Sequence, residues 1–185
     1  GLYERKETLE QIGELLGITR ERVRQLEKAV MTKLKNVAAA ELPHIDSIEI
    51  VLKGHINDFG GVARIKDLAE KVKKDSDKID HSRVSFIVQL VPTLTHVGEN
   101  DHFHNAASLS EHHSEKSVRE NVSNVIDTVK KIGKPVHIKE VAGAMGHPDH
   151  KRVEALASVS KNLATLNSRW GLVKWPMVNL STIVF

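Results

Sequence analysis

The hydrophobic pattern between Thr8 and Lys35 predicts two consecutive helices. Thr8 can cap the first helix, with Gln11 reaching back in a capping box, and Gly17 can end it in a left-handed turn. Thr19 is placed to cap the second helix. Apolar residues recur in both segments at helical spacing, so we expect them to face inward. These residues are Leu9, Ile12, Leu15 and Leu16 in the first helix and Val23, Leu26, Val30 and Leu34 in the second.

The second predicted helix carries a cationic stripe on the side opposite its apolar residues. Residues 19–35 hold six basic residues against two acidic ones, whereas residues 4–14 hold four Glu against two basic residues. The stripe consists of Arg20, Glu21, Arg24, Gln25 and Lys28, with Arg22 on its flank. In the major groove arginine can bind guanine, glutamine suits adenine and glutamate can accept from cytosine. The cations suited to phosphates are Arg22, Lys28, Lys33 and Lys35.

This arrangement predicts a helix-turn-helix that binds DNA through its second helix. Gly13 lets the two helices approach where they cross, and Gly17, four residues later, supplies the turn. The alternative is an ordinary helical hairpin whose charges are only solvated.

The string ETLEQIGELLGITRERVRQLEKAVMTKLK resembles region four of the housekeeping (sigma seventy) class of bacterial sigma factors. In that class a TRERVRQ-type recognition helix reads the minus thirty-five promoter element. The resemblance implies that Arg20, Glu21 and Gln25 read bases and that the module also touches the polymerase beta flap. It implies contacts to the DNA backbone for Thr19, Arg22, Arg24 and Lys28. The chain opens at GLYERKE, as if cut inside region four, and has no aromatic cluster for promoter melting, so we do not expect a complete sigma factor.

The rest of the chain contains an internal repeat with an offset of 73 residues. GGVARIKDLAEKV from Gly60 aligns with GKPVHIKEVAGAM from Gly133, which places Ile65 on Ile138. An amphipathic helix precedes each aligned segment, and glycine then ends it. A short extended segment leads in each copy to a second short helix.

A third helix is predicted near residues 82–94 in the first copy and 151–166 in the second. Two strands should then close each copy. In the first they are expected at 95–97 and 102–104, and in the second at 166–170 and 171–175, joined near Gly171. Helix, strand, two helices and a hairpin is the order of a winged helix, so we expect two in tandem. The alternative is a chance match of unrelated helical segments.

The second copy ends in RWGLVKWP, Arg169 to Pro176, where Trp170 and Trp175 can cap the core from the wing. Together with GKPVHIKEVA, this string resembles the HARE-type winged-helix domain, which is also found in the delta subunit of Gram-positive RNA polymerase. The first copy has HVGENDHFH in place of the tryptophans. The resemblance implies the fold and a transcription setting, but it assigns no binding residues.

Charge separates the two copies. Residues 48–104 hold eight basic and nine acidic residues, whereas residues 118–185 hold ten basic and five acidic ones. Only the second copy therefore has the charge for phosphate contacts, although a scattered, solvated surface is an equal alternative. The candidate cations are Lys130, Lys131, Lys134, Lys139, Lys151, Arg152, Lys161, Arg169 and Lys174. The near-neutral first copy suits a spacer or a protein contact.

Other classes of function find little support. The chain has no Cys, which excludes thiol catalysis and cysteine zinc sites, and its 11 His stand mainly in predicted loops with loose spacing. No phosphate loop, nucleophile elbow or HExxH is present, so we expect no enzyme, cofactor, metal or small-molecule substrate. No run of about 20 apolar residues is present, so we expect a soluble, cytoplasmic protein without membrane contact.

The sequence therefore predicts a mainly α protein with an N-terminal helix-turn-helix and two tandem winged-helix domains with small β-hairpin wings. The expected divisions are residues 1–42, 43–106, a linker at 107–117, and 118–185. The expected function is a sequence-specific bacterial transcription factor that binds double-stranded, promoter-like DNA and contacts RNA polymerase. Its DNA-binding residues are Thr19, Arg20, Glu21, Arg22, Arg24, Gln25, Lys28 and Lys33. The alternative is a protein-interaction module that binds RNA polymerase or a regulator without specific DNA binding.

Overall fold

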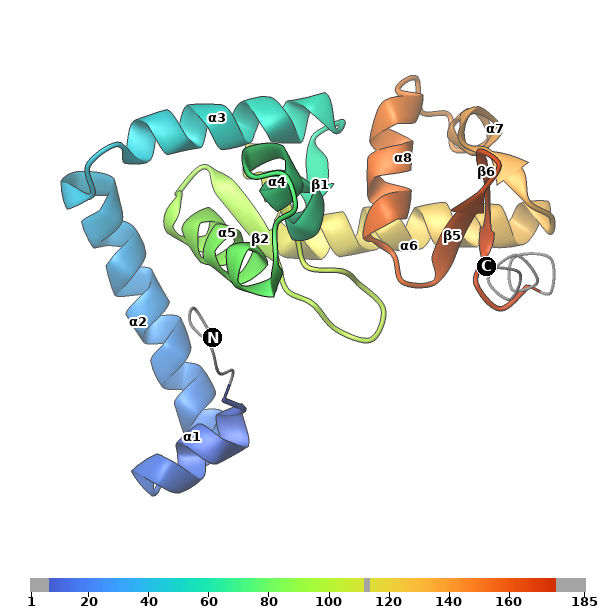
Figure 1. Ribbon diagram of the computed structural model, residues 1–185. Helices are drawn as coiled ribbons and strands as arrows, with labels where there is room; N and C mark the ends of the chain where they lie inside the picture. Colours follow the sequence, from blue (N-terminus) through green and yellow to red (C-terminus); the bar gives the residue numbers. More distant parts are fainter. Residues whose placement is uncertain (1–6, 112–113, 176–185) are drawn as a thin grey trace.

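The computed structural model describes residues 7–111 and 114–175. Its N-terminal part consists of two capped helices (Figure 1). The first, α1 (Leu9–Leu16), begins with the predicted capping box: the Thr8 hydroxyl accepts from the Gln11 amide at 3.2 Å, and Gln11 accepts from the Thr8 amide at 2.8 Å. Gly17 follows with a φ of 66°. Thr19 then caps α2 (Arg20–Glu41), which ends two residues before Pro43 because the residue preceding proline disfavours helix.

α1 packs closely against α2 but covers fewer of its apolar residues than expected. A Cβ on Gly13 would lie 2.7 Å from the Ile18 carbonyl oxygen, so this crossing requires glycine. Of the four α2 residues expected to face inward, only Val23 is buried. The prediction is wrong for the other three, because α1 is eight residues long and reaches only the first turns of α2. These three residues are exposed: Leu26, Val30 and Leu34. In α1 the expectation is also wrong for Leu15 and Leu16, which are exposed, whereas Leu9 and Ile12 are partly buried.

The repeat of elements expected from the sequence is present. The first copy consists of α3 (Ile45–Asp58), β1 (Val62–Arg64), α4 (Ile65–Val72), α5 (Lys78–Leu90), β2 (Leu94–Val97) and β3 (Ala106–Leu109). The second consists of α6 (Glu115–Ile132), β4 (Val136–His137), α7 (Ile138–Ala144), α8 (His150–Val159), β5 (Leu163–Leu166) and β6 (Arg169–Leu172). Both sheets are antiparallel and have matching orders, β1-β3-β2 and β4-β6-β5.

The hairpins differ from the expected ones. The second turns at Asn167 and Ser168, with φ of 47° and 61°, so Gly171 lies within β6 opposite Ala164 rather than at the turn. In the first copy, residues 98–105 form a longer connection than expected, and the second strand is β3. The third helices, α5 and α8, also begin and end earlier than predicted. The linker expected at 107–117 is shorter than predicted, because residues 107–109 belong to strand β3 and α6 already begins at Glu115.

The two copies share a hydrophobic core. Side chains of α6, α7, α8 and the second sheet pack around buried Trp170, with Trp175 partly buried beside them. Val62, Val97 and Ala106 of the first sheet belong to this same cluster. The first copy has in addition a smaller core of its own around Ile56 and Leu68. The second copy is therefore completed by residues of the first.

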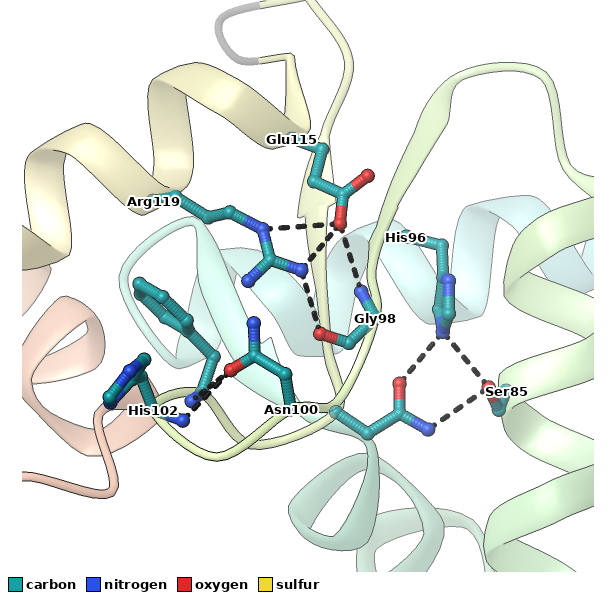
Figure 2. A network of polar contacts seen from close by, with 9 residues as sticks. Ser85, His96, Gly98, Asn100, His102, Glu115 and Arg119 are labelled. Carbon is teal, nitrogen blue, oxygen red and sulfur yellow. Dashed lines mark hydrogen bonds and ion pairs between the residues drawn. The ribbon is translucent and has the colours of Figure 1, made fainter.

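Polar contacts continue this interface along residues 98–104. The Arg119 guanidinium donates to the Gly98 carbonyl at 2.9 Å and to Glu115 at 2.7 Å, and it stacks over Phe103 at 4.7 Å from the ring centroid (Figure 2). The His104 amide donates to the Val159 carbonyl at 2.8 Å. Lys161 pairs with Glu99 at 2.7 Å. These bonds fix α6 and α8 against the loop that joins β2 to β3.

Among the described residues, none of the helices combines the length and the hydropathy that crossing a bilayer requires.

Candidate nucleic-acid interface

The three predicted base-reading residues belong to the first turns of α2. This end of α2 lies beside α1, at the end of the molecule opposite the second sheet (Figure 1). Arg20, Glu21 and Gln25 are all exposed. Arg20 pairs with Glu10 of α1 at 2.8 Å, and its side chain keeps 68% of its accessible surface. Because that ion pair is also exposed, it is weak and leaves the guanidinium able to change partners.

Glu21 connects the neighbouring side chains of the stripe. It accepts from Arg24 at 2.9 and 2.7 Å and from the Gln25 amide at 3.4 Å. The hydrogen bond from Arg24 holds the pKa of the Glu21 carboxyl below its ordinary value. Glu21 therefore stays ionised at neutral pH, as an acceptor of a base amino group must.

The residues predicted to contact the DNA backbone do not all lie on one side of α2. The Thr19 hydroxyl accepts from the Arg22 amide at 3.2 Å, so its first role is to cap α2. The Arg22 side chain donates to Gln25 at 3.4 Å. Lys28 and Lys33 are exposed but point to different sides of α2, because five residues turn a helix through about 140° beyond one full turn.

The predicted base-reading face of α2 continues into the contact of this helix with the first copy. Further along α2, Met31 and Lys35 are partly buried, and α2 packs there against α5. A groove of about 220 Å³ follows this contact; it is lined by Lys28, Met31, Thr32, Lys35, Gln89, Leu94 and His96. Lys28 therefore stands where the exposed face ends and the groove begins. The helical spacing alone did not indicate the groove, because it depends on how the first copy docks.

His96, one of the residues that line this groove, belongs to a polar cluster. It contacts Asn105 at 2.7 Å and Ser85 at 3.1 Å; the contact with Ser85 can be followed in Figure 2. Burial lowers the pKa of the His96 imidazole, so the neutral form is favoured. Hydrogen bonds satisfy this cluster internally, which makes it part of the framework beneath α2.

The cations of the second copy fall into two groups. Arg152 is partly buried and donates to the Gly60 carbonyl at 3.4 Å, and Lys161 pairs with Glu99, so the interface between the copies uses both. The others are exposed: Lys130, Lys131, Lys134, Lys139, Lys151, Arg169 and Lys174. Strand register places His137 directly beside Arg169, a neighbour that the sequence analysis did not single out. Only the alternation of Val136 inside and His137 outside indicates it.

The described residues contain no group of three His, Asp or Glu placed to hold a metal.

Comparison with known families gives a match at the N-terminal helices. Residues 2–36 match the family model described as Sigma-70, region 4, which is a DNA-binding helix-turn-helix of transcription factors. This stretch includes α1 and α2 as far as Asn36, with every exposed side chain of the predicted reading stripe. Comparisons with curated proteins and with solved structures found no match.

Proposed function

We propose that this chain is a transcription factor that reads promoter-like DNA through the first turns of α2. The observation that carries the proposal is the exposed face of Arg20, Glu21 and Gln25, on a helix whose start is fixed by the Thr19 cap and the Gly13 crossing. The similarity of residues 2–36 to Sigma-70, region 4, supports the same use of this face.

The proposed roles follow from side-chain chemistry. Arg20 donates to guanine, Gln25 pairs with adenine and Glu21 accepts from cytosine. Arg24 moves from Glu21 to a phosphate when DNA arrives, which leaves the Glu21 carboxylate free to accept from a base. The proposed backbone contacts are Thr19, Arg22, Arg24, Lys28 and Lys33.

We further propose that the two copies are winged-helix domains, with the β2–β3 and β5–β6 hairpins as wings. Matching element order and sheet topology in both copies support this, as does the resemblance of RWGLVKWP to HARE-type domains. The proposed divisions are residues 1–42 for the helix-turn-helix, 43–106 for the first domain, which β3 extends to Leu109, and 118–185 for the second, which α6 extends back to Glu115. The exposed cations around Lys134 and Arg169 then add sequence-independent phosphate contacts. The near-neutral first domain serves as a spacer, and RNA polymerase is the proposed protein partner.

A binding-site selection from random duplex DNA at two salt concentrations tests the reading of bases. A consensus sequence retained at the higher salt supports the proposal, because attraction to phosphates alone leaves no consensus and falls steeply with salt. Capture of RNA polymerase without any DNA shift at low salt would contradict it and favour a protein-interaction module.

Single substitutions then assign the roles on the selected site. Arg20→Ala should cost about 1 to 3 kcal/mol on that site and relax one base preference. Arg83→Ala is the matched control, because Arg83 is an exposed arginine on α5, outside the proposed interface. Equal losses on all sequences for Arg20→Ala would refute its role in base reading.

A further inference from the structure

The third helix of each copy is covered by another part of the chain. In a winged-helix domain this helix is the one placed to enter a major groove, as the recognition helix of a helix-turn-helix does. In the first copy it is α5, which packs against α2 and is exposed only at Lys78 and Arg83. In the second it is α8, which packs against β1, and its Arg152 donates to the Gly60 carbonyl at 3.4 Å. Contacts within the chain therefore occupy both helices.

The hairpins of the two copies differ in what they contact. The β2–β3 connection of the first copy lies against the second copy, where the Lys161 amide donates to the His102 carbonyl at 2.9 Å. The β5–β6 hairpin of the second copy turns at Asn167 and Ser168, and residues 165–169 are all exposed. The first hairpin is therefore docked, whereas the turn of the second is open to solvent.

An outward row of residues crosses the second sheet beside this turn. Arg169 pairs in register with His137 of β4 and with Leu166 of β5. Residues opposite one another on antiparallel strands project from the same face, and the next residue of β6, Trp170, is buried in the core. The row therefore lies on the face away from the core. The His137 Nδ1 donates to the Ser168 carbonyl at 3.1 Å, which ties β4 to the turn.

Unpaired cations gather around this row. Lys134 lies three residues before His137, and Lys139 lies two residues after it. We call His137, Arg169, Lys134 and Lys139 the wing face. All four are exposed, and the three cations make no ion pair within residues 7–111 and 114–175. Residues 134–139 and 165–174 contain no Asp or Glu, and Glu140 follows on α7.

The cations of the first copy are largely neutralised on their own surface. Five of the eight basic residues between positions 48 and 104 pair with carboxylates at 2.6 to 3.7 Å: Lys53, Arg64, Lys66, Lys73 and Arg83. The wing face instead keeps its charge for an external partner. Lys130 and Lys131 lie in the last turn of α6, where cations favour the helix dipole, so the inference does not rest on them.

We propose that the wing face binds the phosphate backbone of duplex DNA, while α5 and α8 hold the chain together. This inference rests on the DNA binding proposed above and names the surface of the second copy that takes part in it. A duplex presents phosphates at regular spacing, so cations alone can bind it without reading bases. Figure 1 shows α1 and the second sheet at opposite ends of the molecule, so α2 and the wing face contact separate stretches of backbone.

Fluorescence anisotropy of the full chain on a random duplex of about 30 base pairs, at several salt concentrations, tests the wing face. The double variant Lys134→Ala/Arg169→Ala should reduce the salt slope by about two units, because two phosphate contacts are lost. The matched control Lys78→Ala/Arg83→Ala removes the same charge from the exposed side of α5 and should leave the slope unchanged. Lys151→Ala is the corresponding control on α8, where Lys151 is exposed. Circular dichroism checks that each variant is folded.

Three outcomes would overturn the proposal. Equal slope losses in the wing-face variant and in the α5 control would show a response to net charge alone. A larger loss for Lys151→Ala than for Arg169→Ala would place DNA on α8. Unchanged duplex binding by the wing-face variant, together with weaker binding of labelled polyglutamate, would identify an acidic protein as the partner instead of DNA.

The binding-site selection separates this proposal from base reading by α2. A selected consensus, with an unchanged salt slope for the wing-face variant, would overturn the wing face alone. Absence of a consensus, with the slope still reduced by about two units, would refute base reading and support the wing face. A chain that binds no duplex at low salt would overturn both.

Discussion

Replacing Gly60 by alanine tests how the two copies are joined. Gly60 follows α3 with a φ of 97°, and its backbone lies against the first turn of α8. A Cβ there would lie 2.8 Å from the Lys151 carbonyl oxygen and 3.1 Å from the Arg152 Cα. Both are backbone atoms, so no side-chain rotation relieves the clash, and the two copies must separate or the α3 end must shift.

The expected loss of stability has two parts. A non-glycine residue at this φ costs about 1 to 3 kcal/mol. Forcing an extra carbon into a packed contact costs about 1 to 3 kcal/mol more. Gly133→Ala is the matched control, because Gly133 also has a positive φ, 75°, but a Cβ there would meet nothing within 4 Å. Its cost should be about 1 to 2 kcal/mol, from the backbone alone.

Urea unfolding of both variants measures the difference. Tryptophan fluorescence reports on buried Trp170 in the second copy, and far-ultraviolet circular dichroism reports on the helices of both. Because Val62, Val97 and Ala106 contribute to the core around Trp170, Gly60→Ala should lower the midpoint seen by both probes. Equal losses in Gly60→Ala and Gly133→Ala would refute the close contact between Gly60 and α8.

Two further predictions concern the cores. Burial lowers the pKa of His96 and of His104 below the unfolded value, so the unfolded chain binds protons more readily. The free energy of unfolding should therefore reach its highest value above about pH 6.5 and fall as the pH drops below it. In urea titrations, His96→Gln should reduce this fall. His150→Gln, a substitution at an exposed site, should not. Trp170→Ala should cost about 3 to 5 kcal/mol by thermal or urea unfolding, because the buried indole fills the second core, and a smaller loss than for Trp175→Ala would contradict this.

Features set by neighbouring residues could be predicted from the sequence. The Thr8 capping box, the left-handed Gly17 and the Thr19 cap each depend on three or four consecutive residues, and each forms as expected. The repeat also predicted the order of elements, because the start of each second helix, Ile65 and Ile138, is fixed by a buried side chain after a short strand.

Features set by distant contacts could not be predicted. The spacing of Leu26, Val30 and Leu34 identifies an apolar side of α2 but not what covers it, and α1 proves too short to do so. In the second hairpin, the turn was predicted at Gly171, whereas Asn167 and Ser168 form it. Asparagine tolerates a left-handed backbone, and that signal was available in the sequence.

The candidate site was predicted as a set of residues on one helix. The structure adds where the first copy lies relative to these residues, which limits the path that bound DNA could take. Arg20, Glu21 and Lys28 lie on the side of α2 that faces the first copy further along, where Lys28 already lines the groove beside Gln89. DNA seated on the reading face must therefore run past this groove. Lys33 points to another side, about 140° around the helix from Lys28.

This direction predicts unequal roles for two exposed lysines of α2. Lys28→Ala should weaken binding to the selected site and reduce the salt slope by about one unit, as the loss of one phosphate contact does. Lys33→Ala should have a smaller effect on both, because Lys33 emerges about 140° around the helix from Lys28 and reaches only the edge of the contacted DNA backbone. Titrations of the two variants at several salt concentrations, with circular dichroism to confirm equal helix content, measure the difference. A larger effect of Lys33→Ala would place DNA on the side of α2 that carries Leu26, Val30 and Leu34, and the reading face would have to be reassigned.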